Sequence, residues 1–351
     1  MPRPARVAQL RRMIQAGGFS YDPTRPVDMH VHIVGDGSTG SGCILHGGGW
    51  AHRMLYKFME GHIGLPRGSM NGDLDRALEE KLAECAAKSS LGGCAVLAQD
   101  HVYDSRGRRM SDRGSYYVPN EYVFGVCRRH PKLLPVASIH PARPDAMEEL
   151  NRCIDAGAVM LKLLPNCNNV DCNDRKYTKF WERMAEVGMP LLAHTGGEHT
   201  LDIVNARLGN PRVVTLPLDV GMTVIAAHSA GKSGLHDPEY FPVLCKMMRK
   251  YPNLHADQSA LNIPLRSRLF AKLKRGIAAE RLVHGSDFPV PVFGVWAWMR
   301  GHIDWKTCSR WQRHPNLLER DLRLKMAIGL PRESFTRGWK LLRLPHTPKG
   351  S

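Results

Sequence analysis

Short apolar runs alternate along the chain with longer segments whose apolar positions have helical periodicity. Eight runs of strand length are rich in Val, Leu, Ile and Ala: 27–34, 93–99, 134–139, 158–164, 189–195, 222–228, 253–257 and 281–287. Amphipathic segments of helix length lie between them, at 73–90, 119–130, 144–156, 174–187, 199–208, 238–251 and 265–279. This alternation favours parallel strands joined by helical crossovers. We therefore predict an α/β fold, a (β/α)8 TIM barrel, with an open doubly wound sheet as the alternative.

Two segments depart from the regular alternation. Residues 35–72, after the first strand, contain the Gly-rich stretch "GDGSTGSGCILHGGGW", and we expect an insertion there that serves as a lid or a partly ordered loop. The stretch "NLLERDLRLKMAIGLPRESFTRGWKLLRL" supplies helices after the eighth strand. One barrel domain is thus predicted over 27–345, preceded by an N-terminal arm or capping segment at 1–26.

Composition narrows the class of protein. Of the 351 residues, 43% are hydrophobic and 23% are charged, and no run of 18 apolar residues could span a bilayer. The N-terminal "MPRPARVAQLRRMIQAGGF" lacks the apolar segment of a secretory signal, and the nine cysteines form no C-x-x-C pair. We therefore expect no membrane association and a reducing, cytoplasmic location.

The net charge of +16 favours an anionic partner. Because the basic residues are spread along the chain and no nucleic-acid-binding motif accompanies them, we expect a small anionic substrate and not nucleic acid. Trp296, Trp298 and Trp305 in "PVFGVWAWMRGHIDW" fit a contact in a homo-oligomer, a pocket wall or a core equally well.

Polar residues at the carboxyl ends of the predicted strands are the candidate site, because a TIM barrel builds its active site there. The spacing of these residues is an independent test. Lys162 and His194 are 32 residues apart, and His194 and His228 are 34 apart, each the length of one strand-helix unit. We expect six side chains to point into one mouth: His30, His32, Lys162, His194, His228 and Asp287.

These residue types suit a metal centre. A strand sends His30 and His32 to the same face, where one cation can bind both imidazoles. Asp287 would be a carboxylate ligand and would accept a proton from metal-bound water. Lys162, in "VMLKLLPN", is anomalous because lysine is rarely buried without a partner. Burial lowers its pKa, and the neutral amine can add carbon dioxide to give an anionic carbamate ligand.

The ordered segments "DMHVH", "LKLLP", "LLAHTGGEH", "AAHSAGKSG" and "HGSDFP" resemble the amidohydrolase superfamily of metal-dependent TIM-barrel hydrolases, in particular its branch that also contains non-oxidative decarboxylases. The resemblance covers residues 27 to 343. It implies that His30, His32 and Asp287 hold the more buried metal and that His194 and His228 hold a second. Lys162, in a setting similar to the strand-4 lysine of dihydroorotase, would be carboxylated and would bridge the two. One or two Zn²⁺ ions per chain are expected, although other divalent metals fit these ligands.

The decarboxylase branch implies another use of the same residues. One metal is bound there by the equivalents of His30, His32, His194 and Asp287, whereas the residue matching His228 is an acid/base catalyst and Lys162 stays unmodified. Two reactions therefore remain open. Hydrolysis of an amide, ester or lactone by metal-activated water, with Asp287 and His228 as catalytic residues, is preferred over mononuclear decarboxylation. A non-catalytic binding protein is disfavoured, since unpaired polar groups in a barrel mouth are costly to keep.

Two further strand-end residues are candidates for substrate binding. Both lie after the third predicted strand, in "SIHPARPDA". Arg143 could pair with a substrate carboxylate, and His140 should by position face the metals. A solvated loop arginine and a loop-packing histidine are the alternative interpretations.

Overall fold

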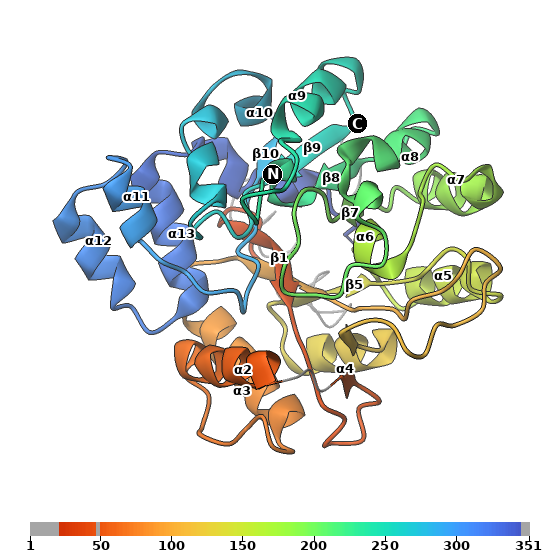
Figure 1. Ribbon diagram of the computed structural model, residues 1–351, viewed down its shortest axis with the longest axis horizontal. Helices are drawn as coiled ribbons and strands as arrows, with labels where there is room; N and C mark the ends of the chain where they lie inside the picture. The colour runs from red at the N-terminus through yellow and green to blue at the C-terminus, as the bar shows by residue number, and fades with distance from the viewer. Residues whose placement is uncertain (1–20, 47–49, 345–351) are drawn as a thin grey trace, which may run out of the picture.

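The computed structural model describes residues 21–46 and 50–344, and a sheet of eight parallel strands lies at its centre (Figure 1). The strands follow one another in chain order around the sheet. They are β1 (Val27–His32), β3 (Gly93–Leu97), β5 (Leu133–Ala137), β6 (Met160–Leu163), β7 (Leu191–Ala193), β8 (Val224–Ala226), β9 (Leu254–Asp257) and β10 (Leu282–Val283). All eight predicted strands are confirmed, and the TIM barrel with them.

The chain after β10 closes the barrel against β1. The amide of Met29 donates to the carbonyl of His284 at 2.9 Å, Asp287 N to His30 O at 2.8 Å, and His32 N to Phe288 O at 2.7 Å. A parallel bridge between Val31 and Phe288 continues the ladder. Closure therefore aligns the segment that carries Asp287 directly beside the strand that carries His30 and His32.

Helices surround the strands (Figure 1). Those that follow β3 to β9 in turn include α4 (Asn120–Arg129), α5 (Ala146–Asp155), α6 (Pro165–Asn168), α7 (Thr178–Glu186), α8 (Thr215–Asp219), α9 (Phe241–Lys250) and α10 (Gly276–Glu280). Three helices, α11 (Val295–Met299), α12 (Trp305–Gln312) and α13 (Leu317–Ile328), follow the eighth strand as predicted. Among the residues described here, no helix has both the length and the apolar character needed to cross a membrane.

Two predicted helices are wrong. Within 199–208 only a 3-10 turn at Ala206–Gly209 forms. Tertiary contacts override the helical pattern there, because the amides of Val204 and Asn205 both donate to the carbonyl of Asn166, each at 3.0 Å. The segment 265–279 is divided into short 3-10 and α-helical pieces, and Gly276 at its last break adopts a φ of 68°.

The insertion after β1 is packed against the barrel. It contains β2 (Ile44–Leu45), which pairs antiparallel with β4 (Tyr116–Tyr117), and α2 (Trp50–Ile63). The buried carboxylate of Asp75, in the first turn of α3 (Leu74–Lys88), accepts hydrogen bonds from the amides of Asp36, Gly37 and Thr39. Asp73 precedes α3 at the N-cap position, but its carboxylate pairs with Arg76 and not with a helix amide. Residues 47–49 of the Gly-rich stretch lie outside the described chain.

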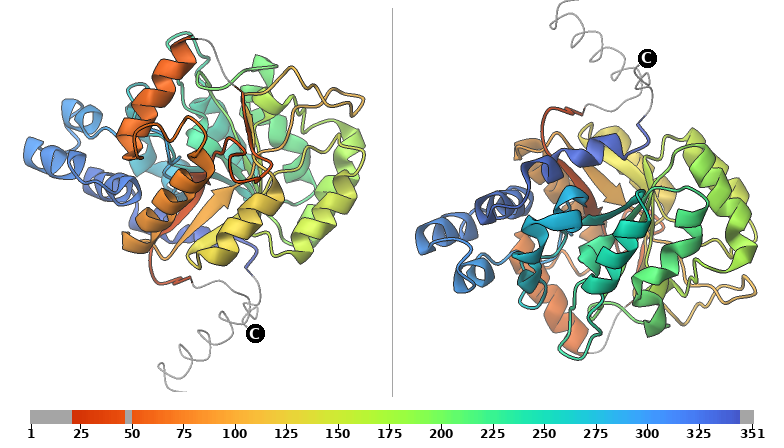
Figure 2. Two further views of the ribbon diagram at one scale, coloured as in Figure 1. Left: turned by 90° about the horizontal axis from the view of Figure 1, so that it is seen from below. Right: turned by 90° about the horizontal axis from the view of Figure 1, so that it is seen from above.

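The end of the barrel opposite α2 is closed by the two ends of the described chain (Figure 2). Tyr21 stacks on Trp339 with ring centroids 5.2 Å apart, and the Trp339 indole N–H donates to the carbonyl of Arg25 at 2.8 Å. Of the predicted N-terminal arm, residues 1–20 lie outside the described residues. All nine cysteines are unpaired, and eight of them are buried.

Candidate metal centre

Three ligand-type atoms converge at the carboxyl end of the barrel. His30 Nε2 lies 3.1 Å from His32 Nε2 and 3.1 Å from Asp287 Oδ1, and His32 Nε2 lies 3.3 Å from the same oxygen. Atoms that bind one divalent ion at about 2.1 Å are separated from each other by about 3.0 to 3.4 Å in octahedral or tetrahedral coordination. The triangle therefore has the dimensions of one face of a metal coordination shell.

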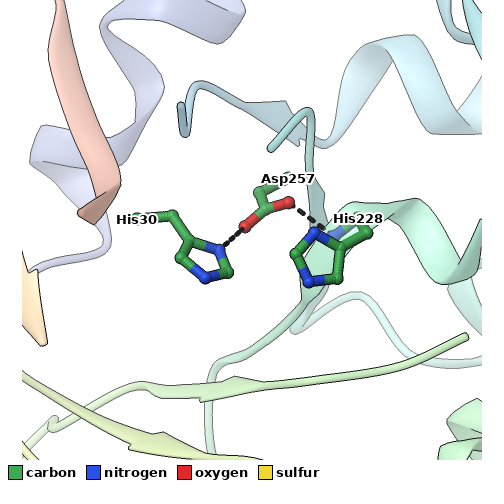
Figure 3. Close-up of side chains that lie close together, drawn as sticks. All are labelled: His30, His228 and Asp257. Carbon is green, nitrogen blue, oxygen red and sulfur yellow. Dashed lines mark hydrogen bonds and ion pairs between the residues drawn. The ribbon is translucent and has the colours of Figure 1, made fainter. Parts of the chain in front are cut away.

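A buried carboxylate fixes the orientation of the His30 ring. Asp257, at the end of β9, accepts a hydrogen bond from His30 Nδ1 at 2.7 Å, and both side chains are fully buried. Figure 3 shows the Asp257 carboxylate between the His30 ring and the backbone nitrogen of His228, which donates to it at 2.6 Å. Because Nδ1 carries the proton, Nε2 presents a lone pair to the triangle, as a metal ligand requires.

The same carboxylate begins a chain of hydrogen bonds that defines two further rings. Ser259 Oγ donates to Asp257 at 2.5 Å and accepts from His228 Nδ1 at 2.8 Å. His228 Nε2 is then an acceptor, and His194 Nδ1 donates to it at 3.1 Å. His194 Nε2 is left as a buried lone pair without a hydrogen-bond partner in the described chain. Both nitrogens of His228 are occupied, whereas His194 keeps one free.

Two of the predicted site residues adopt unusual backbone conformations. Asp287 has a φ of 69°, and His228, Ser229 and Ala230 have φ values of 58°, 51° and 53°. A left-handed conformation in a residue other than glycine costs about 1 to 3 kcal/mol and persists where surrounding contacts enforce it. The His228 amide bonded to Asp257 Oδ1 is one such contact, and Ser229 Oγ, which donates to the Asp257 carbonyl at 2.6 Å, is another.

Lys162 lies at the centre of the predicted mouth. Its side chain is 1% exposed, and Nζ lies 3.0 Å from His30 Nε2. Burial lowers the pKa of the amine to about 8, against the opposing effect of Asp287 and Asp257. Thus a cationic nitrogen faces the same imidazole lone pair that points into the ligand triangle.

The ionisation of His32, His194 and Asp287 suits metal binding; burial and Lys162 lower the pKa of His30, but Asp287 and Asp257 outweigh them and raise it above its ordinary value. Burial lowers the pKa of His32 to about 4 and that of His194 to about 3, so both rings are neutral at pH 7. Burial alone would raise the pKa of Asp287, but His30 and His228 reverse this and hold it well below its usual value. Neutral imidazoles and an ionised carboxylate are the protonation states in which these side chains bind cations.

Among the described residues, two groups of three side chains could hold a metal ion. In the group His30, His228 and Asp257, the Asp257 carboxylate is already engaged by His30 Nδ1, the His228 amide and Ser259. In the group His30, His32 and Asp287, the facing atoms are a carboxylate oxygen and two imidazole nitrogens, the donor set that zinc and other first-row metals accept. The second group therefore fits a bound ion better.

A small cavity that is open to solvent lies near the site; its interior space is about 20 Å³, and no residue of the ligand triangle lines it. Tyr116 on β4 lines it, and the Tyr116 hydroxyl lies 3.2 Å from His32 Nδ1. Other lining residues include Gln99, His101, Arg113 and Cys167. The cavity thus adjoins the ligand triangle through Tyr116, a residue that the sequence patterns did not single out.

The two predicted substrate-binding residues are engaged in other contacts. His140 Nε2 lies 2.9 Å from the carbonyl of Asn168, and its Nδ1 accepts from the amide of Ala142 at 3.1 Å. Arg143 forms ion pairs with Asp100 at 3.2 Å and with Asp145 at 2.7 Å. Their substrate roles stay predictions.

A buried arginine that sequence reasoning missed lies beside the ligands. Arg266 is 4% exposed, and its Nη1 lies 3.9 Å from Asp287 Oδ2. It follows β9 in the segment "NIPLRSRLF", outside any strand end. Nothing in the local pattern separates it from the other 48 lysines and arginines, so only the folded chain identifies it.

A family model described as Amidohydrolase matches residues 27–306. The chain belongs to the amidohydrolase family. The matched range contains every predicted ligand of this amidohydrolase, from His30 to Asp287. No curated protein matches its sequence.

Solved structures are similar to this amidohydrolase at low identity. An uncharacterised TIM-barrel protein from Bordetella bronchiseptica is 18% identical with a TM-score of 0.53, over 86% of this chain and 99% of its own. A putative 2-pyrone-4,6-dicarboxylic acid hydrolase from Pseudomonas putida is 14% identical with a TM-score of 0.50, over 90% and 98%. A 2,6-dihydroxybenzoate decarboxylase from Rhizobium is 16% identical with a TM-score of 0.49, over 90% and 99%. The first two likenesses concern the TIM-barrel fold.

Proposed function

We propose that this amidohydrolase is a metal-dependent hydrolase of an amide, ester or lactone in a small anionic substrate. His30, His32 and Asp287 would hold the ion, with Zn²⁺ as the expected metal, and His194 Nε2 would be a fourth ligand. The observation that carries the proposal is the triangle of ligand atoms with edges of 3.1 to 3.3 Å. A divalent ion bound there would lower the pKa of a coordinated water and would polarise a carbonyl oxygen.

The chain's own groups would then handle the proton. Asp287 Oδ1 faces the two histidines, whereas Oδ2 lies 3.7 Å from His228 Nδ1 and is not hydrogen-bonded by either histidine of β1. Asp287 would accept the proton of the attacking water on Oδ2 and pass it to the leaving group. The hydrogen bond to Ser259 would hold the His228 ring beside Oδ2 of Asp287. The substrate would enter the site from the side of the small cavity lined by Tyr116.

The number of ions is the finer part of the proposal. A single ion is supported by the hydrogen bonds that occupy both nitrogens of His228, through Ser259 and His194. A carbamate on Lys162 that bridges two ions stays a prediction. In the single-ion arrangement Lys162 would remain an amine beside His30 and would orient the substrate.

The hydrogen bonds that occupy both nitrogens of His228 also favour a second candidate function. A mononuclear centre with His228 outside the ligand set matches the arrangement expected for a non-oxidative decarboxylase. In that reaction His228 would protonate the carbon from which carbon dioxide leaves, once its Nδ1 proton is released from Ser259 Oγ. Hydrolysis and decarboxylation differ in their products, so one assay separates them.

The test combines metal analysis with product analysis. We expect about one equivalent of divalent metal in protein purified without chelator, and a loss of most of it in His30→Ala, with His199→Ala as the matched control. His199 pairs with Asp237 at 2.9 Å and is not one of the proposed ligands. Metal-free wild-type protein, or a metal content unchanged in His30→Ala, would overturn the proposed centre.

Protein equilibrated with ¹³CO₂ and metal would be examined for the ¹³C signal of a carbamate. This signal, together with two equivalents of metal, would support two ions bridged by carboxylated Lys162. Its loss in Lys162→Ala would confirm the assignment. Panels of lactones and esters on one side, and of aromatic acids monitored for carbon dioxide release on the other, then decide between the two reactions.

A further inference from the structure

The guanidinium of Arg266 is a buried charge with few partners. Its Nη2 donates to the carbonyl of Gly197 at 2.9 Å, and Nε is buried with no hydrogen-bond partner in the described chain. Nη1 comes no closer to a carboxylate than 3.9 Å, at Asp287 Oδ2. A guanidinium offers five N–H donors, so most of the hydrogen-bonding capacity of Arg266 is unused.

The nearby carboxylates give this guanidinium no hydrogen bond in the described chain and act on it only through their charge: burial raises the pKa of Glu198, but His194 and Arg266 together hold it below its usual value. Asp287 Oδ1 contacts both histidines of β1. Glu198 Oε1 accepts hydrogen bonds from the amides of His199, Thr200 and Leu201. Burying an ion that is not fully hydrogen-bonded is costly, so an unsatisfied buried group of this kind requires an explanation.

Arg266 differs in this respect from Arg143, the arginine that the sequence suggested. Arg143 is held between Asp100 and Asp145, with two charge-paired contacts. Arg266 lies deeper, at 4% exposure, and its free donors lie next to Asp287. An anion bound by Arg266 would therefore be adjacent to the proposed catalytic base.

We propose that Arg266 binds a carboxylate of the substrate, so that the substrate is a small organic acid anchored beside Asp287. Arginine pairs with carboxylates through two parallel N–H···O bonds, which fix orientation as well as affinity. This proposal rests on the proposed function, because the bound acid is a substrate only if the protein is an enzyme. The binding step itself requires neither a metal nor turnover.

The experiment compares benzoate with its neutral isostere benzamide, and acetate with acetamide as a smaller pair, by isothermal titration calorimetry. Protein as purified and protein treated with chelator are both used, because carboxylates also bind metals. We expect the carboxylates to bind wild type at least tenfold more tightly than the amides in both states. Arg266→Gln should abolish this preference, and Arg266→Lys should retain part of it, since lysine is a point charge without the planar fork.

Arg300→Gln is the matched control. Arg300 donates to Ser267 Oγ at 2.8 Å and to the carbonyl of Pro264 at 3.0 Å, so it contacts the same segment from its exposed side. This variant should keep the wild-type preference. An undiminished preference in Arg266→Gln, or no preference in wild type, would refute the inference.

Thermal melting separates binding from a structural role. If Arg266 served only to hold the carbonyl of Gly197, Arg266→Gln would lower the melting temperature by several degrees. A binding role predicts an unchanged or raised melting temperature, because the variant removes an unpaired buried charge. If instead the metal or hydrolysis assays fail while carboxylate binding through Arg266 persists in metal-free protein, the proposed function falls and this inference stands.

Discussion

At the scale of single residues, the ligand cluster depends on which nitrogen of each histidine faces it. Asp257 sets this for His30 through a 2.7 Å contact with Nδ1, although Asp257 does not belong to the triangle itself. A partner of this kind fixes the ring and raises its basicity, and its loss typically costs 10- to 100-fold in metal affinity. The centre therefore extends beyond the residues that would touch the ion.

Asp257→Asn tests this contribution. We expect a decrease in metal affinity of about 10- to 100-fold, because the amide accepts a weaker hydrogen bond from His30 Nδ1. Competition with a chromophoric chelator measures the affinity. Glu79→Gln is the matched control, since Glu79 pairs with His130 at 2.9 Å on the outside of the barrel. Equal metal affinities in Asp257→Asn and wild type would contradict the orienting role.

At the scale of elements, the insertion after β1 reaches the site through a two-strand ladder. Leu45 of β2 pairs with Tyr116 of β4, and the Tyr116 hydroxyl contacts His32 Nδ1 at 3.2 Å. We expect Tyr116→Phe to weaken metal binding by about tenfold or less, because a neutral hydroxyl is a weaker partner than a carboxylate. Chelator competition again supplies the measurement.

Tyr117→Phe is the control for this element. Tyr117 lies on the same short strand, but it stacks on His101 with ring centroids 3.6 Å apart. The Tyr117→Phe variant should bind metal with the affinity of the wild-type protein. A common effect of both substitutions would point to the ladder as a whole and not to the hydroxyl.

Helix α13 supports the segment after β10 that carries Asp287. Lys325 is fully buried; its Nζ lies 2.5 Å from Asp321 Oδ2 and donates to the carbonyl of Gly285 at 2.8 Å. Asp321 Oδ1 also accepts from Asn262 at 2.7 Å. Removing one member of such a pair leaves an uncompensated charge in the interior, at a cost of about 3 to 5 kcal/mol.

Lys325→Met should therefore lower the free energy of unfolding by about 3 to 5 kcal/mol at pH 7, and Lys325→Met with Asp321→Asn should regain much of it. Burial raises the pKa of Asp321 to about 6, against the opposing effect of Lys325, and loss of the lysine raises it further. The folded state then binds a proton that the unfolded state lacks, so stability falls as pH rises from about 4 through the folded pKa. Urea unfolding at pH 5 should show a smaller deficit for Lys325→Met than unfolding at pH 7, and an equal deficit would contradict the account.

At the scale of the whole molecule, the two segments that close the barrel also supply the atoms of the ligand triangle. Hydrogen bonds between β1 and the segment around Asp287 join the first and last strands, and an ion bound at the triangle would link them again. A ligand that binds only the folded state at 100 times its Kd adds about 2.7 kcal/mol to the free energy of unfolding. Chelator treatment should thus lower the melting temperature by a few degrees.

Calorimetry with and without restored Zn²⁺ checks this expectation. Reloading should recover the original melting temperature, whereas Mg²⁺, which prefers oxygen ligands, should have a smaller effect. No change on chelation would argue against an ion that bridges the barrel closure.

The sequence by itself determined the barrel and most of the candidate site. Strand and helix periodicities are local, so eight strands could be located, and unit spacing placed His30, Lys162, His194 and Asp287 at one end of them. The helix expected at 199–208 does not form, because the amides of Val204 and Asn205 donate to the carbonyl of Asn166, which is distant in the chain.

Tertiary structure alone decided the contacts between groups far apart in sequence. Asp257 and His30 are separated by 227 positions, so no local pattern could reveal that one orients the other. Arg266 is unremarkable as one of many basic residues, and it becomes distinctive only once its burial and its unused donors are known. Periodicity fixes which residues face the mouth, whereas side-chain hydrogen bonds, which depend on distances in the folded chain, fix what each residue can do there.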